Sequence, residues 1–197
     1  MGNNENLQDD FIEHQDFIVA EFNYIAQTAF QAHEDRARVS EFFLVSFGTF
    51  IAALFSSQFS DVDPYLLYAV FSILFIVVAF LGMLTTLELS RLRLAWLASI
   101  KSMNEMKDYL IKNRPALEQC FPWRTETIPE PFKPWSVGFM KALQVSILSG
   151  FSISAATIFI RFSSGISEVN WVFNIFVAGF AAILYLVLFY YLPLRNK

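Results

Sequence analysis

The segment PYLLYAVFSILFIVVAFLGMLTTL, residues 64–87, holds no charged side chain. A helix rises about 1.5 Å per residue, so roughly 20 apolar residues cross the hydrocarbon of a bilayer, and each charge placed there costs on the order of 3 kcal/mol. Three further charge-free runs cover residues 42–60, 142–160 and 169–194. The four runs predict an all-α membrane protein with four transmembrane helices and helical cytoplasmic extensions.

The composition agrees with a chain that resides in a bilayer. Hydrophobic residues make up 55% of the 197 positions, charged residues only 16%, and the mean hydropathy is +0.45. These values exclude disordered, low-complexity and collagen-like classes. One cysteine, Cys120, and two histidines, His14 and His33, are too few for an internal disulfide or a structural metal site. We therefore expect no metal, no cofactor and no direct binding of double-stranded nucleic acid.

Lys and Arg are distributed unevenly about the four runs. Thirteen of the 14 lie before the first run, between the second and third, or after the fourth, and the exception is Arg161. Because cytoplasmic flanks retain positive charge, this asymmetry predicts cytoplasmic N- and C-termini in a multi-pass membrane protein. The first 40 residues lack the apolar core of a signal peptide, so the first span is expected to direct insertion.

Charge and hydropathy together divide the chain into five segments. They are an acidic cytoplasmic amphipathic helix (1–41), a first transmembrane helix pair (42–87), a cytoplasmic helix with a Pro-rich loop (88–141), a second transmembrane pair (142–194) and a basic cytoplasmic tail (195–197).

The acidic first segment has the pattern of a helix. Phe11, Ile18 and Ile25 recur every seven residues and form an apolar seam that no Gly or Pro interrupts. Residues 1–41 carry 9 acidic and 2 basic side chains, whereas residues 88–141 carry 6 acidic and 9 basic ones. The resulting net charges of −7 and +3 favour docking of the two pieces on each other. Self-association of the seam in an oligomer is the alternative.

The segment 88–141 has a helical first half and an irregular second half. Its apolar residues recur at helical spacing as far as Leu110, and Pro115 predicts the helix end, because a residue before proline avoids helical geometry. Four prolines between positions 122 and 134 then exclude a regular helix. Trp135, just before the third span, is expected to be an anchor at the membrane interface.

The spans contain hydroxyl-bearing residues in helical register but no ionisable ones. Ion-coupled transporters place ionisable groups or broken helices near the middle of the membrane, so that class is not favoured. Hydroxyl faces line a wet, uncharged pore in one interpretation and pack helices closely in the other. The candidate pore-lining residues are Ser46, Thr49 and Ser56 in the first span and Ser146, Ser149 and Thr157 in the third.

Two further sets of residues mark contacts and span ends. Small residues and one amide in the last two spans predict helix packing, at Gly150, Asn174, Ala178 and Ala182. Charged residues at the cytoplasmic ends of the spans are candidates for a gate or an inner mouth, with local ion pairs as the alternative; they are Arg36, Arg38, Glu88, Arg91 and Arg93.

Local signatures of common enzyme sites are missing from the sequence. None of the motifs GxxxxGK[ST], GxGxxG, HExxH and GxSxG occurs. His33 beside Glu34 and Asp35 is better interpreted as a solvated charged cluster, since adjacent residues of a helix point in different directions. The sequence therefore predicts a protein that is not an enzyme.

One arrangement of charges and spans suggests a family. Glu34, Asp35, Arg36 and Arg38 on a cytoplasmic helix run into paired spans, and Glu88, Arg91 and Arg93 leave the membrane on another helix. Over residues 20–115 this layout resembles small bacterial membrane effectors of antiphage defence, of which the SLATT-type effector domains are the nearest. Those domains have two spans, whereas this chain has four predicted ones. The resemblance implies an oligomeric pore or membrane-disrupting effector, controlled by a partner or a nucleotide signal.

We therefore expect a homo-oligomeric inner-membrane protein that acts as a gated pore or ion channel, an effector in bacterial antiphage defence. Its expected partners are the lipid bilayer, further copies of itself, and a soluble cytoplasmic partner or small signalling ligand. The alternative is a membrane scaffold that anchors a soluble partner protein through its cytoplasmic helices.

Overall fold

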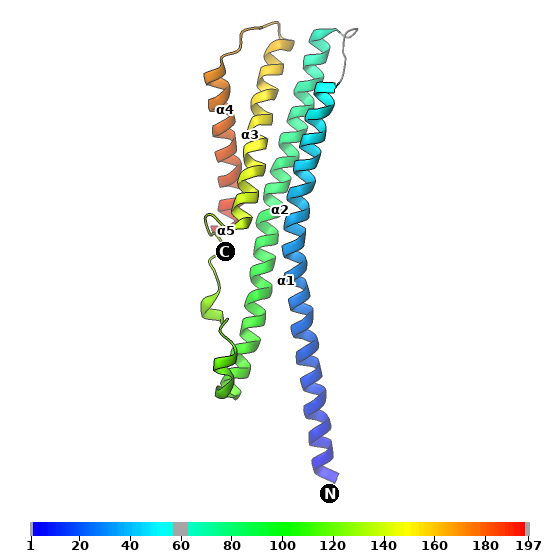
Figure 1. The fold of residues 1–197 in the computed structure, drawn as a ribbon, viewed down its shortest axis with the longest axis vertical. Helices are drawn as coiled ribbons and strands as arrows, with labels where there is room; N and C mark the ends of the chain where they lie inside the picture. Colours follow the sequence, from blue (N-terminus) through cyan, green and yellow to red (C-terminus); the bar gives the residue numbers. More distant parts are fainter. Residues whose placement is uncertain (1, 57–62, 196–197) are drawn as a thin grey trace. The chain divides into compact units, whose positions relative to one another are not determined.

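The computed structural model describes residues 2–56 and 63–195, with side chains described for 16–55 and 63–195, and these residues form helices and loops without a strand (Figure 1). The long helices are α1 (Gly2–Ser56), α2 (Pro64–Asn113), α3 (Val137–Ser163) and α4 (Trp171–Tyr185). The shorter elements are the 3-10 helices η1 (Pro115–Cys120) and η2 (Thr125–Thr127), the π-helical turn η3 (Leu186–Tyr191) and α5 (Leu192–Arg195).

Four helical stretches are long and apolar enough to cross a bilayer, namely those in α1, in α2, in α3 and in the run from α4 to α5. The prediction of an all-helical chain with four helices able to cross a membrane is thereby confirmed for the described residues, whereas the side on which the termini lie stays a prediction. The last two spans begin at capped ends. Ser136 Oγ accepts a hydrogen bond from the Phe139 amide, and Asn170 Oδ1 accepts one from the Phe173 amide. Residues 57–60 of the first predicted run lie outside the described residues.

Contacts divide the chain into two compact units. The arm unit consists of Met1–Glu34 and Arg93–Glu130, and the bundle unit consists of Asp35–Leu92 and Pro131–Lys197. The predicted borders at residues 41 and 88 follow charge and hydropathy, whereas the observed borders follow packing. α1 and α2 each contribute one part to either unit, because neither helix contains an internal proline that would end it.

Two glycines allow the helices of the bundle unit to approach closely. A Cβ atom on Gly82 of α2 would lie 3.2 Å from the ring of Phe43 on α1 and would overlap Ser149 Oγ on α3. A Cβ atom on Gly150 of α3 would overlap the carbonyl oxygen of Ala178 on α4. Lipid is as apolar as a side chain, so close packing of this kind is a main source of helix association in a bilayer.

Aromatic rings pack α1, α2 and α3 together toward the end of the bundle where α2 begins. Phe75 of α2 stacks on Phe159 of α3 with ring centroids 5.6 Å apart, and it meets Phe50 of α1 edge to face at 5.2 Å. Tyr68 lies 5.4 Å from Phe162 in the same cluster. Such ring pairs contribute about 0.5–1.5 kcal/mol each beyond the area that they bury, so this cluster orients α2 against both neighbours.

The π-helical turn η3 interrupts the fourth span, which hydropathy alone presents as uniform. Its wider turn is shown by Leu192, whose amide bonds the carbonyl of Val187 five residues earlier. Pro193 follows directly; its ring has no N–H and would collide with the carbonyl four residues earlier in a regular helix. The extra residue in the turn removes this conflict and leaves Tyr190 inside the bundle unit, only 2% exposed.

Replacing Gly150 by alanine should destabilise the bundle unit by about 1–3 kcal/mol, because the added methyl group meets the backbone of α4. Gly179→Ala is the matched control. A Cβ atom at Gly179 would meet nothing within 4 Å, and alanine is favoured over glycine in a helix by about 1 kcal/mol. Equilibrium unfolding of both variants in detergent measures the difference. Equal stabilities of the two variants would contradict the close α3–α4 contact.

Candidate functional site

The predicted pore-lining residues separate by helix. On α3, Ser146 and Ser149 are fully buried inside the bundle unit, and Thr157 is half-buried. On α1, Ser46 is half-buried and Thr49 is exposed. The side chain of Ser56 lies outside the described residues. The five described residues therefore do not share one surface: Thr49 of α1 is exposed, Ser46 and Thr157 are half-buried, and Ser146 and Ser149 lie inside the bundle unit.

The hydroxyl groups inside the bundle unit are mostly occupied by backbone carbonyls. Ser149 donates to the Val145 carbonyl at 2.8 Å, and Thr86 of α2 donates to the Gly82 carbonyl at 2.8 Å. Ser146 Oγ is buried and has no hydrogen-bond partner in the part of the chain that the structure describes. This arrangement matches the packing interpretation for Ser149 and Thr157, because each donates its hydroxyl proton to a carbonyl of its own helix.

The four residues predicted to pack helices lie together at the α3–α4 contact. Gly150 lies opposite Ala178 and Ala182, and a Cβ atom on Gly150 would lie 3.0 Å from the Cβ atom of Ala182. One turn farther along, Ser154 donates to the main-chain carbonyl of Asn174 at 2.9 Å, and Thr157 Oγ1 lies 3.2 Å from Asn174 Oδ1. Interhelical hydrogen bonds of this type contribute about 0.6–2 kcal/mol in a membrane.

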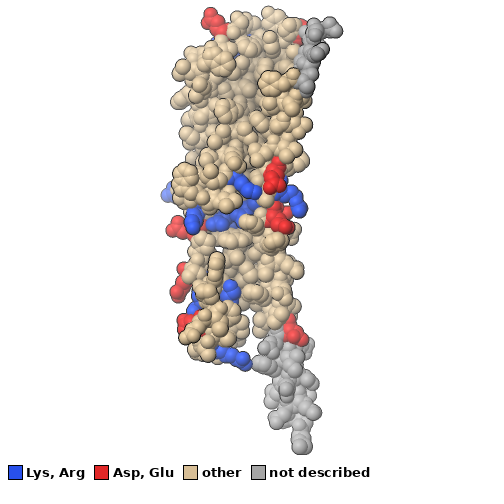
Figure 2. Space-filling view, viewed as in Figure 1, with Lys and Arg blue, Asp and Glu red and all other residues tan. Residues whose placement is uncertain are grey.

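The predicted mouth charges are divided between the two units. Arg93 belongs to the arm unit, where its guanidinium lies 4.7 Å from the centroid of Trp96 and donates to the Glu130 carbonyl. The other four belong to the bundle unit. Arg38 is exposed and lies 3.8 Å from Asp35, and Glu88 and Arg91 are exposed. Figure 2 shows Lys and Arg gathered together with Asp and Glu next to a surface that is almost free of charged residues.

Arg36 differs from its neighbours because it is buried, with 7% of its surface exposed. A Cβ atom on Gly138 would lie 3.5 Å from Arg36 Nη1 and 3.1 Å from the hydroxyl of Tyr190. Glycine at this position lets both polar groups approach the first turn of α3. This meeting of α1, α3 and η3 was not predicted from the sequence; the glycine in the first turn of α3 and Pro193 after η3 are the signals that could have indicated it.

Trp135, the predicted interface anchor, precedes α3 in an unusual backbone conformation. Its φ angle is 61°, in the left-handed region that non-glycine residues rarely adopt, and 79% of its surface is exposed. Its ring meets Phe139 at 6.2 Å between centroids. The indole is thus held outward at the start of the third span, while its anchoring role stays a prediction.

In the arm unit, the two pieces that were predicted to dock lie side by side. Ile18 and Phe22 of α1 line an apolar hollow of about 210 Å³ together with Met106 and Leu110 of α2. Lys107 Nζ lies 6.0 Å from the centroid of the Phe22 ring. The apolar seam of the N-terminal helix is therefore used within the chain at these residues.

Asp108 attaches the Pro-rich loop to α2. Its carboxylate accepts a hydrogen bond from the Thr125 amide at 3.4 Å and pairs with the guanidinium of Arg124, which also contacts Glu118 at 3.2 Å. Hydrogen bonding from Thr125, and then from Arg124, lowers the pKa of the Asp108 carboxyl below its usual value. The same pairing raises the pKa of Arg124.

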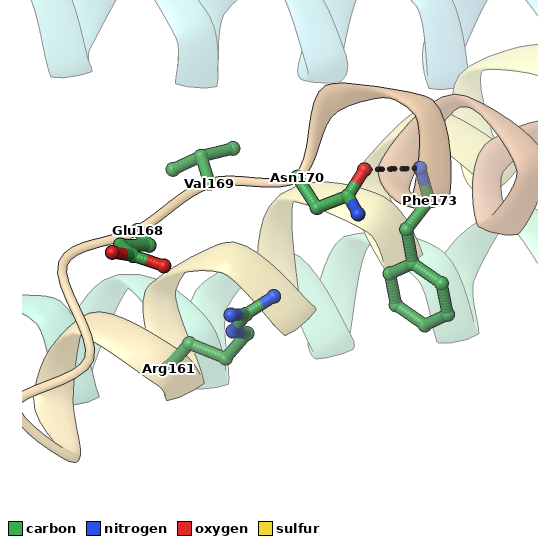
Figure 3. Close-up of a pocket in the computed structure, with 5 residues that line it drawn as sticks. All are labelled: Arg161, Glu168, Val169, Asn170 and Phe173. Atoms are coloured by element: carbon green, nitrogen blue, oxygen red, sulfur yellow. Dashed lines mark hydrogen bonds between the residues drawn. The ribbon is translucent and has the colours of Figure 1, made fainter.

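A hollow of about 570 Å³ lies at the end of the bundle unit where α3 passes into α4 (Figure 3). Its lining residues are Arg161 at the end of α3, Glu168, Val169 and Asn170 on the loop, and Phe173 in the first turn of α4. Figure 3 shows the Arg161 guanidinium reaching from α3 toward the loop, with Glu168 on one side and the ring of Phe173 on the other.

No family model, curated protein or solved structure matches the chain. Among the described residues no group of His, Cys, Asp and Glu could hold a metal ion. What the protein does must therefore be argued from the surfaces and hollows described above.

Because the pKa of Asp108 is lower in the folded chain, its contribution to loop docking is present above the unfolded value of about 3.9 and is lost as the pH falls below it. We expect a spin label on Cys120, an exposed residue of η1, to gain mobility as the pH falls below about 4. In Asp108→Asn the label should be mobile already at neutral pH.

Glu105→Gln is the control for this titration, because Glu105 pairs with Lys101 on its own helix, at 3.8 Å, and not with the loop. It should keep the pH profile of the unmodified chain. A label in Asp108→Asn that is as immobile as in the unmodified chain at neutral pH would contradict this attachment.

Proposed function

We propose that the chain assembles into a homo-oligomeric pore in the bacterial inner membrane, with both termini in the cytoplasm, and that it acts as an effector in antiphage defence. A partner protein or a small signalling ligand opens or closes the pore through the cytoplasmic helices. The resemblance to SLATT-type effector domains suggests the defence role, and the bundle unit supplies the physical argument for assembly.

The observation that carries the proposal is the outward face of α1 in its apolar stretch. Val45, Gly48 and Thr49 are exposed there, and a Cβ atom on Gly48 would meet nothing within 4 Å. A glycine inside a helix lowers the stability of that helix by about 1 kcal/mol relative to alanine. At Gly82 and Gly150 the close helix contacts that glycine permits within the chain offset this loss. Gly48 has no such contact and adjoins the exposed Thr49, whereas Gly179, which also has none, adjoins the exposed ring of Phe180. The small, polar face at Gly48 and Thr49 supports close approach by a helix of another copy.

The distribution of hydroxyl groups favours α1 as the wall of the pore. The α3 hydroxyls at Ser146 and Ser149 are covered by their own bundle unit, whereas Thr49 is uncovered and Ser46 partly so. Several α1 helices around one axis would turn Ser46 and Thr49 toward it. Such a wall carries no charge, so the pore would select weakly among ions and would close by dewetting.

A membrane anchor is the second candidate function, and the arm unit provides the observation that favours it. Phe17, Tyr24 and Phe30 of α1 are 71%, 66% and 64% exposed, although they lie outside the charge-free stretch of that helix. Large exposed apolar side chains on a water-facing helix are typical of a protein-binding surface. An anchor would bind its partner through them and would conduct no ions.

Gly48→Leu tests the pore. A leucine side chain there should separate the copies, so we expect light scattering in detergent to give a smaller particle and liposome flux to fall to background. Gly179→Leu is the matched control on α4, where Phe176 and Phe180 stack at 6.1 Å on the outward face and a Cβ atom has equal space. Gly179→Leu should keep the particle size and the liposome flux of the unmodified chain. An unchanged oligomer in Gly48→Leu, or an oligomer of the unmodified chain that stays impermeable with every partner and ligand tried, would refute the proposal.

Cys120 tests the orientation, because it is the single cysteine of the sequence and is exposed in the arm unit. With cytoplasmic termini, a membrane-impermeant maleimide should leave Cys120 unlabelled in intact spheroplasts and label it after lysis. Ser164→Cys in a Cys120→Ser background should show the reverse, since Ser164 is an exposed residue just after α3. Labelling of Cys120 in intact spheroplasts would contradict the proposed orientation.

A further inference from the structure

The hollow between α3 and α4 lies where two spans end. Arg161 is in the last turn of α3, and Phe173 is in the first turn of α4. Trp171 beside it is 68% exposed, and the exposed ring of Tyr65 stands at the start of α2. Indole and phenol rings at span ends mark the headgroup region of a bilayer, so the hollow faces lipid headgroups at one of the two membrane surfaces.

The hollow presents one positive and one negative side chain that do not form an ion pair with each other. Arg161 is half-buried and Glu168 is exposed, and no salt bridge joins them in the part of the chain that the structure describes. Arg161 is also the one Lys or Arg of 14 that lies away from the predicted cytoplasmic flanks. A guanidinium matches the geometry of a phosphate, and a carboxylate accepts hydrogen bonds from an ammonium group.

The remaining lining residues complete such a site. Asn170 Oδ1 is occupied by the Phe173 amide, at 3.1 Å, and its Nδ2 group points to the hollow as a further donor (Figure 3). The ring of Phe173 forms one wall, where its face attracts a cation. Two kinds of donor, one carboxylate and one aromatic ring therefore surround a single space.

We propose that this hollow binds a phosphate–ammonium zwitterion, the headgroup of phosphatidylethanolamine, with the phosphate at Arg161 and the ammonium at Glu168. Glu168 disfavours phosphatidylglycerol, whose headgroup adds only negative charge. It also favours phosphatidylethanolamine over phosphatidylcholine, because a quaternary ammonium is attracted by charge but has no N–H to donate to the carboxylate. The inference does not depend on a pore and holds for either orientation in the membrane.

Native mass spectrometry of the full chain in detergent, titrated with each of the three lipids, tests the site. We expect binding of phosphatidylethanolamine to exceed that of phosphatidylglycerol and phosphatidylcholine by about threefold to tenfold, as for one or two charge-assisted hydrogen bonds at a partly exposed site. Glu168→Gln should abolish this preference and strengthen phosphatidylglycerol binding. Arg161→Gln should weaken binding of all three lipids.

Asp63→Asn is the matched control. It removes a carboxylate at the same end of the bundle unit and keeps the side-chain oxygen that accepts the Tyr65 amide at 3.0 Å, so the lipid preference should not change. Circular dichroism establishes that all three variants remain helical. An unchanged order of lipids in Glu168→Gln, or a preference lost equally in Asp63→Asn, would overturn the proposal.

A soluble compound with the same chemistry is the other source to be distinguished. Free phosphoethanolamine should fail to displace the lipid at equal concentration, because it lacks the glycerol and acyl chains that hold the headgroup at the span ends. Displacement at equal concentration would overturn the assignment to a lipid.

Discussion

The hydrocarbon of a bilayer offers no water to backbone N–H and C=O groups, and the structure follows from that constraint. Each span has to satisfy its own backbone, so the chain forms long continuous helices rather than sheets or loops at that depth. Side chains gain little by leaving lipid for protein, so the helices are held by close approach instead. Gly82 and Gly150 provide that approach within the bundle unit. The π-helical turn before Pro193 obeys the same rule, because it keeps the backbone bonded where a proline would break it.

Polar groups are used differently on the inside and the outside of the bundle unit. Ser149, Ser154 and Thr86 bond carbonyl oxygens and leave no polar surface toward lipid. Gly48 and Thr49 of α1 are left uncovered by the rest of the chain. A helix that is packed on one face and carries small or polar residues on the other is suited to assembly with further copies. This difference is the reason for proposing α1 as the wall of a pore.

The two ends of the bundle unit also differ in charge. At one end Arg36 is buried beside Gly138 and Tyr190, while Arg38, Glu88 and Arg91 remain exposed. At the other end Arg161 and Glu168 surround a single hollow. Exposed arginines such as Arg38 and Arg91 are suited to interaction with an anionic lipid surface in general, whereas one cation and one anion in a shaped hollow can distinguish one headgroup from another.

The sequence by itself determined the number of spans, the continuity of α1 and α2 and the irregular loop after Pro115, since hydropathy, charge and proline act through neighbouring residues. It also singled out Gly150, Asn174, Ala178 and Ala182, which follow helical spacing. Only the tertiary structure decided that Ser149 is covered while Thr49 is not, that Arg36 is buried two residues before an exposed Arg38, and that Arg161, Glu168 and Phe173 line one hollow. Those outcomes depend on which helix faces which, and that is set by contacts between residues far apart in the chain.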